Sequence, residues 1–144
     1  LFKKNAFPIF MGILAGVITS VLSAYLLSTA FGLSPELKIS MIPKSLTTAI
    51  ASAVAEEYGG IVPITIVGVM VSGIGGAVIA PSVIKLFRIK DPVAQGVCIG
   101  TSSHAAGTSK AIEMGEIQGA MSGLAIALAG FISVILIPII LAIF

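Results

Sequence analysis

Two polar stretches interrupt otherwise apolar parts of the sequence, and they hold the side chains that could do chemistry. Lys44 lies in the first stretch and His104 in the second, so each stretch can supply a positive charge. The hydroxyl-bearing and small residues around them are Ser45, Thr47 and Thr48 in the first stretch and Thr101, Ser102, Ser103, Gly107, Thr108 and Ser109 in the second. Hydroxyls donate hydrogen bonds, and the free N–H groups at the start of a helix favour negative charge. This combination favours a small organic anion, such as a carboxylate, over a metal ion or an apolar ligand.

Each polar stretch lies between two short helices that the sequence predicts. A capping side chain followed by proline is typical of a helix start, and it occurs at Ser34-Pro35 and at Asp91-Pro92. About nine residues later a helix breaker follows each start, namely Pro43 and Gly100. We expect a second short helix after each break, at about 47–57 and 108–114. Nine helical residues cover about 14 Å, roughly half of the hydrocarbon core of a bilayer, so both stretches would lie near its midplane.

Long apolar runs between these segments indicate helices that cross a membrane. Of the 144 residues, 57% are hydrophobic and 10% are charged, whereas about 25% are charged in an ordinary soluble domain. No charged residue occurs in the runs 5–35, 58–84 and 117–144. Each run exceeds the roughly 20 residues that span a bilayer. We therefore predict an all-α integral membrane protein, in which transmembrane helices at about 7–31, 61–86 and 118–143 alternate with two broken or re-entrant helical hairpins.

Charge and composition also exclude several classes of protein. The net charge of +2 is too small for a protein that binds nucleic acid through its charge. A single cysteine, Cys98, and a single histidine exclude a disulfide framework and a metal site rich in cysteine or histidine. The motifs GxSxG and HExxH and a glycine-rich phosphate loop do not occur, so we expect neither an enzyme nor a cofactor.

The sequence repeats itself with a period of 57 residues, in units at 34–87 and 91–144. The period takes Pro35, Gly73 and Pro81 to Pro92, Gly130 and Pro138. Broken segments at equivalent places in two halves point to the binding site of a transporter. We expect a single transmembrane domain over 1–144, as the C-terminal part of a longer protein.

The repeat is inverted if the broken segments are re-entrant hairpins and parallel if they cross the membrane. Hairpins would put five loop cations on one side of the membrane and one on the other, whereas crossing segments would divide them two and four. Because cytoplasmic loops carry an excess of lysine and arginine, the sequence favours the inverted hairpin arrangement.

Each candidate residue also has a structural alternative. Lys44 could extend to the membrane interface, and His104 could form a hydrogen bond that locks its hairpin. The threonine and serine hydroxyls could cap helices or bond the preceding turn. Lys110 is a further candidate for contact with an anion, and it could instead pair with Glu113 three residues later.

The sequence resembles the LrgB/CidB family over most of residues 40–144. The similarity is carried by IPKSLTTAIA at 42–51, by GIGGAVIAPSVIKLFRIKDPVAQGVCIGTSSHAAGTSKAIEMGE at 73–116, and by the helix that follows from Gln118. Three residues depart from the family pattern: Ser102 replaces alanine, Ala49 replaces a frequent proline and Lys110 replaces arginine. Lysine keeps the charge of arginine but lacks its planar fork, so Lys110 could contact an anion but not through two parallel hydrogen bonds.

The resemblance implies two functions. Bacterial members of the family are antiholin-like proteins that act with a small holin-like partner on murein hydrolase activity and cell lysis. Plastid relatives are glycolate/glycerate translocators, and bacterial relatives are linked with export or uptake of small carboxylates such as pyruvate. Because the polar stretches favour transport, we expect a carrier for a glycolate-, glycerate- or pyruvate-like monocarboxylate, with the antiholin-like modulator as the alternative. Either would be a multi-pass protein of the bacterial cytoplasmic membrane, and we expect a homo-oligomer.

Overall fold

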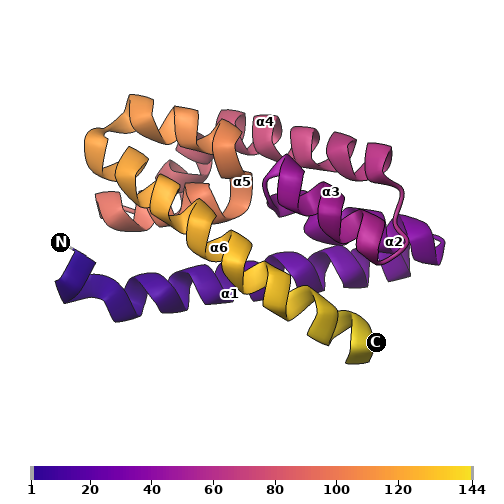
Figure 1. The fold of residues 1–144 in the computed structure, drawn as a ribbon. Coiled ribbons are helices and arrows are strands. Elements are labelled where there is room, and N and C mark those ends of the chain that lie inside the picture. The colour runs from indigo at the N-terminus through magenta and orange to yellow at the C-terminus, as the bar shows by residue number, and fades with distance from the viewer. Residues whose placement is uncertain (1, 144) are drawn as a thin grey trace.

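Three long helices alternate with two broken segments along the chain (Figure 1). The computed structural model describes residues 2–143, with side chains for 6–142. The long helices are α1 (Phe2–Ala30), α4 (Val62–Leu86) and α6 (Glu116–Ile143). The first broken segment comprises α2 (Pro35–Met41), the 3-10 helix η1 (Ile42–Ser45) and α3 (Thr48–Glu57), and the second is α5 (Pro92–Met114). No β-strand occurs within residues 2–143, so the predicted all-α class is confirmed.

The three long helices are able to cross a membrane, as the sequence predicts. Their apolar spans are Ala6–Ala30, Val62–Leu86 and Glu116–Ala142, with 25, 25 and 27 residues. One face of α4 is apolar and more than half exposed, at Val67, Val71, Ile74 and Val78. Such a row of side chains is unfavourable in water and favourable against lipid. The chain is therefore a membrane protein.

The second broken segment folds back on itself. Gln118, which follows α5, donates from Nε2 to Oε1 of Gln95 near the start of α5, at 3.1 Å. Ile99 and Ala111 belong to one buried cluster, although residues 12 apart in a continuous helix lie about 18 Å from each other. The two arms of α5 are therefore antiparallel, and we call α5 the second hairpin, with its tip at 101–104.

The first broken segment also folds back, so that its end lies beside its beginning. The Ile61 N–H donates to Oγ of Ser40 at 2.7 Å, and Oγ1 of Thr65 donates to the Ser40 carbonyl at 3.0 Å. The chain after α3 therefore lies beside α2, and we call α2–η1–α3 the first hairpin, with its tip at 42–47.

The two hairpins lie at opposite ends of the long helices. Figure 1 shows the outer ends of α2 and α3 where α4 begins, and the outer ends of both arms of α5 where α4 finishes. The hairpin arrangement requires this placement. That the hairpins enter a bilayer from its two sides, and that the repeat is inverted, stays a prediction.

Both predicted helix starts are confirmed. The Leu37 N–H donates to Oγ of Ser34 at 3.5 Å, and the Val93 N–H donates to Oδ1 of Asp91 at 2.7 Å. In each case proline occupies the first turn of the helix. The N–H groups of that turn have no acceptor within the helix, so the N–H that proline lacks is not missed.

One of the two breaks is not where the sequence predicts. At the predicted position Pro43, α2 gives way to η1, and the backbone is extended at Leu46. The second break falls at His104, with φ of 39° and ψ of −136°. The prediction of a break at Gly100 is wrong, because Gly100 lies inside the first arm, where a Cβ would overlap the Ser122 carbonyl and lie 2.8 Å from the Ser122 Cα. Glycine there permits close packing of α5 on α6.

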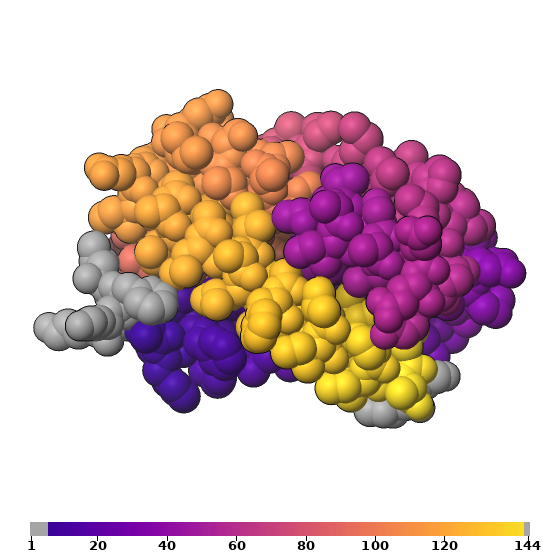
Figure 2. Space-filling view, viewed as in Figure 1, coloured from indigo at the N-terminus to yellow at the C-terminus, as the bar shows by residue number. Residues whose placement is uncertain are grey.

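An apolar core joins α1, the first hairpin and α6. Ile13, Val17, Ile42, Ala125 and Ile137 are almost completely buried in one cluster. Figure 2 shows α6, in yellow, crossing this face of the molecule between the second hairpin, α3 and α1. Helix α6 therefore covers one side of the region in which the two hairpins approach each other.

Candidate functional site

A groove of about 1060 Å³ runs between α1, α4 and the first arm of α5, and it ends at the tips of both hairpins. Its lining extends from Pro8 to Ser20 on α1, from Val71 to Ile84 on α4 and from Asp91 to Ser103 on α5, and η1 adds Lys44 and Ser45. Twelve helical residues cover about 18 Å, which is more than half the thickness of a bilayer core. The groove is thus long enough to connect one surface of a membrane with its middle.

The lining of the groove changes from apolar to hydroxyl-rich along its length. Ile9, Ile84 and Val93 line the end near Asp91, and hydroxyl-bearing residues line the end at the hairpin tips. We call these the Asp91 end and the tip end. Among the described lining residues, the hydroxyl and ammonium donors therefore lie at the tip end.

Lys44 brings a positive charge to the tip end. Its half-buried side chain donates from Nζ to Oγ of Ser45 at 3.4 Å, and this Oγ lies 2.6 Å from Oγ of Ser20. Among the described side chains the one ion pair is Lys110–Glu113, so no carboxylate oxygen lies within 4 Å of the Lys44 ammonium. A charge removed from water without a partner is unfavourable, and an anion in the groove would relieve this.

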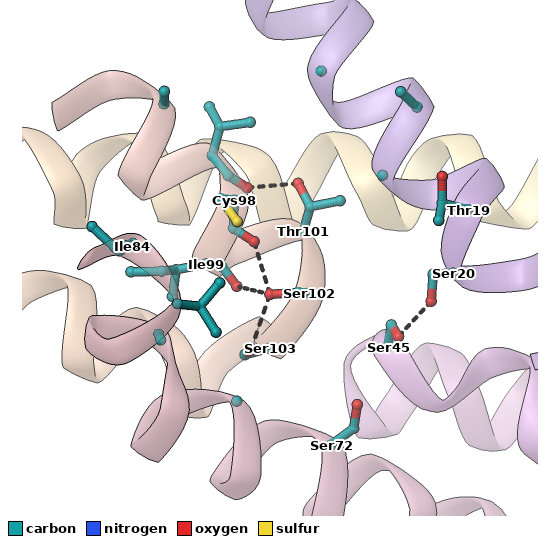
Figure 3. Close-up of a pocket in the computed structure, with 18 of the residues that line it drawn as sticks. Thr19, Ser20, Ser45, Ser72, Ile84, Cys98, Ile99, Thr101, Ser102 and Ser103 are labelled. Carbon is teal, nitrogen blue, oxygen red and sulfur yellow. Dashed lines mark hydrogen bonds between the residues drawn. The ribbon is translucent and has the colours of Figure 1, made fainter. Parts of the chain in front are cut away.

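The second hairpin adds further hydroxyls to the tip end. Oγ of Ser102 lies 3.1 Å from Oγ of Ser103, and the Ser102 hydroxyl also donates to the Cys98 carbonyl at 2.8 Å. Figure 3 shows this cluster on one side of the pocket and the hydrogen-bonded pair Ser20 and Ser45 on the other. The structure therefore brings Lys44, Ser45, Ser102 and Ser103 to one cavity. That they bind a ligand stays a prediction.

His104 does not line the groove but holds the tip of the second hairpin on α4. Its Nε2 lies 2.9 Å from the Val69 carbonyl oxygen, and the ring occupies a space that a Cβ at Gly73 would fill. The positive φ of His104 is unusual for a residue other than glycine. This geometry agrees with the structural alternative for His104, a hydrogen bond that locks the hairpin.

The other predicted binding residues also lie outside the groove lining: Thr47, Thr48, Gly107, Thr108 and Lys110. The Thr108 hydroxyl donates to the His104 carbonyl at 3.0 Å and lies 2.7 Å from Oγ of Ser122 on α6. Nζ of Lys110 lies 2.7 Å from Oε2 of Glu113 at an exposed site. In this structure Thr108 serves packing of the second hairpin on α6, and Lys110 forms a surface ion pair.

Three hydroxyl-bearing residues of the groove were not predicted, namely Thr19 and Ser20 on α1 and Ser72 on α4. All three lie in runs without charged residues, which the sequence indicates only as transmembrane helices. Their polarity in the middle of an apolar helix is the signal that could have identified them, because polar groups at that depth usually face the protein interior.

Comparison with known proteins yields one family and several relatives. The model of the LrgB-like family matches residues 1–143. Over 136 residues the chain is 38% identical to the antiholin-like protein LrgB of Bacillus mycoides and 37% identical to the protein of that name in Bacillus cereus. Each alignment covers 94% of this chain and 59% of the relative. It is 36% identical over 141 residues to the uncharacterized protein YxaC of Bacillus subtilis, which is 98% of this chain and 61% of that protein. The chain thus spans about three fifths of the length of these relatives. No solved structure matches it significantly.

Proposed function

The chain belongs to the LrgB-like family, and we propose that it acts as a membrane carrier for a small organic anion that binds at the tip end of the groove. The proposed substrate is a monocarboxylate of the size of glycolate, glycerate or pyruvate. The observation that carries the proposal is the half-buried ammonium of Lys44, which faces the groove and has no carboxylate partner among the side chains that the structure describes.

The surroundings of Lys44 support a carboxylate in particular. The Lys44 ammonium has three N–H groups and directs one of them at Ser45, so two remain for a ligand, whereas a carboxylate has only acceptors. Hydrogen bonds between such donors and an ionised group are about twice as strong as those between neutral groups. Among the described lining residues, the charged side chain at the other end is Asp91, which would repel a carboxylate.

The groove also supports movement of the ligand. Its lining connects the Asp91 end with the tips over about 18 Å, so a solute entering at the Asp91 end would reach the middle of the bilayer without crossing lipid. In transporters with broken helices, the substrate binds near the midplane, where two repeats meet.

The second candidate function is that of an antiholin-like modulator in the bacterial cytoplasmic membrane. The name "antiholin-like protein LrgB" of the relatives favours it. The exposed apolar face of α4 would then offer a surface to a small holin-like membrane protein or to a second copy of the chain. Its readout would be murein hydrolase activity and cell lysis.

Uptake into proteoliposomes tests the carrier function. The full-length protein, its Lys44→Ala and Lys44→Arg variants and a Lys38→Ala control would be compared with labelled glycolate, glycerate and pyruvate. Lys38 carries the same charge on α2 but lies outside the groove lining. We expect saturable uptake, a half-saturation concentration about tenfold or more higher for Lys44→Ala, partial recovery for Lys44→Arg and no change for Lys38→Ala. Absence of saturable flux for all three anions, with binding of a holin-like partner retained, would instead support the modulator.

A further inference from the structure

We propose that Ser20 of α1 is a further anion-binding residue of the groove, and that Ser20 and Ser45 together present one O–H donor to the bound carboxylate. This inference rests on the proposed function, because it adds a long helix to an anion site that the sequence assigns to the two hairpins alone.

Ser20 lies where α1 meets both hairpin tips. Its side chain lines the groove, and it also borders a void of about 10 Å³ together with Ser45 and Thr101, one from each tip. One turn earlier, a Cβ at Gly16 would lie only 2.6 Å from Cγ2 of Thr101, so α1 packs tightly on the second hairpin there. A hydroxyl at position 20 therefore occupies the junction of three segments.

The hydroxyl of Ser20 is used differently from that of a neighbouring serine on the same helix. Oγ of Ser23 donates to the Ser20 carbonyl at 3.1 Å, which is the usual bond of a serine to the preceding turn of its own helix. Oγ of Ser20 instead lies 2.6 Å from Oγ of Ser45, 25 positions away in the sequence. Figure 3 shows the two hydroxyls facing each other beside the pocket.

A count of protons shows that this pair retains a donor. Two hydroxyls carry two hydrogens, and only one hydrogen can lie between the two oxygens. The Lys44 ammonium has no acceptor capacity, so it donates to Ser45 and uses neither hydroxyl hydrogen. Whichever serine donates within the pair, the remaining hydrogen has no acceptor among the described hydrogen bonds. It is available to an anion in the groove.

The direction of the hydrogen bonds from Lys44 through Ser45 favours Ser20 as the residue that offers this hydrogen. When Lys44 donates to Ser45 and Ser45 donates to Ser20, each bond polarises the next and strengthens it. The Ser20 hydroxyl is then the end of the chain and a stronger donor than an isolated serine. A carboxylate bound to both Lys44 and Ser20 would close this chain on its two oxygens.

The test uses Cys98, the single cysteine among the 144 residues, as a reporter of the groove. Cys98 is exposed and lines the groove, so a bound anion should slow its reaction with N-ethylmaleimide. The full-length protein would carry no other reactive cysteine. Glycolate and pyruvate are the probes, and the measured quantity is the anion concentration that halves the alkylation rate. The variants are Ser20→Ala, the shape-matched pair Ser20→Thr and Ser20→Val, and the control Ser23→Ala.

We expect the half-protecting concentration to rise about tenfold in Ser20→Ala and Ser20→Val, through the loss of one hydrogen bond to a charged group. Ser20→Thr keeps the hydroxyl and should stay within about threefold of the unmodified protein, and Ser23→Ala should be unchanged. The alkylation rate without anion should be the same throughout, which a collapse of the groove would alter. If Ser20→Ala does not fold, the threonine and valine variants still differ in the hydroxyl alone.

Two negative outcomes have different meanings. If an anion protects Cys98 in the unmodified protein, and the half-protecting concentration is the same in Ser20→Val as in Ser20→Thr, the role of Ser20 is overturned. The anion site itself would then remain supported. If neither glycolate nor pyruvate protects Cys98 in the unmodified protein, and neither is taken up by proteoliposomes, the proposed function fails and the role of Ser20 fails with it.

Discussion

Gly75 and Gly76 are adjacent on α4, and a methyl group added to each would meet opposite surroundings. At position 76 a Cβ would overlap Oγ of Ser103 and lie 2.7 Å from the Ser103 Cβ, whereas at position 75 nothing lies within 4 Å. Carbon atoms in favourable contact are about 3.5–4.0 Å apart. We therefore expect Gly76→Ala to displace the tip of the second hairpin by about 1 Å.

The change in the free energy of unfolding follows from two opposing effects, helix propensity and overpacking. Alanine stabilises a helix interior by about 1 kcal/mol relative to glycine, and this term is the same at both positions. Overpacking costs about 1–3 kcal/mol, and it applies at position 76 only. Gly75→Ala should therefore stabilise the protein by about 1 kcal/mol, and Gly76→Ala should be neutral or destabilise it by up to about 2 kcal/mol.

Thermal unfolding of both variants in one detergent, followed by circular dichroism, measures this difference. In chains of 150–250 residues, a change of 1 kcal/mol in stability shifts the unfolding midpoint by about 2–4 °C. The midpoint of Gly76→Ala should therefore lie several degrees below that of Gly75→Ala. Anion protection of Cys98 should also weaken in Gly76→Ala, because Ser103 leaves its position at the tip end. Equal midpoints, or a higher midpoint for Gly76→Ala, would refute the close contact between α4 and the hairpin tip.

Four further predictions follow from the same structure. Gly100→Ala should lower the unfolding midpoint, since its Cβ would overlap the Ser122 backbone, whereas Gly123→Ala, with nothing within 4 Å, should raise it. His104→Ala should lower the stability by about 1 kcal/mol, because the hydrogen bond to the Val69 carbonyl is lost. His104→Asn should be less destabilised, because asparagine adopts positive φ more readily than alanine, and the unfolding midpoints of the two variants test this. In a variant without Cys98, cysteines at positions 33 and 57 should react with an impermeant maleimide from one side of the membrane and a cysteine at 88 from the other; position 33 reacting from the side of 88 would contradict the hairpin topology. Lys44→Met should raise the unfolding midpoint and lower anion uptake, and a lowered midpoint would indicate that Lys44 stabilises the fold.

The long helices and the first break could be predicted because their causes are local. A bilayer requires about 20 apolar residues for each crossing, and the runs without charge mark α1, α4 and α6 to within a few residues at most ends. Pro43 lacks an N–H group and coincides with the end of α2, whereas Pro81 and Pro138 lie inside α4 and α6 without ending them, so the polar stretch that follows Pro43 is part of the signal. The second break could not be predicted in this way. Gly100 either ends or packs a helix according to what lies beside it, and here α6 lies beside it.

The candidate site was predictable where charge and hydroxyls cluster in the sequence and not where single residues converge in space. Lys44, Ser45, Ser102 and Ser103 lie in two polar stretches, and the fold brings these stretches to one groove. Ser20 joins them from an uninterrupted helix, and its face is decided by the packing of α1 on both hairpins. His104 was expected to face a ligand, but its side chain direction follows from its own positive φ, which the sequence does not specify.

The position of Lys44 bears differently on the two proposed functions. A half-buried ion without a charged partner is unfavourable for folding, and an apolar side chain of similar length at this place would be as stable or more stable if structure alone mattered. A modulator that acts through its outer apolar faces gives no reason to keep an ammonium at the end of an internal groove. The proposed carrier would give one, because an ammonium without a carboxylate partner among the described side chains would contribute binding energy when an anion arrives. The hydroxyls of Ser45 and Ser20, aligned behind the ammonium at 3.4 and 2.6 Å, extend this argument. In the proposed carrier this pair would present one O–H donor before a ligand binds, and such preorganisation would lower the cost of binding.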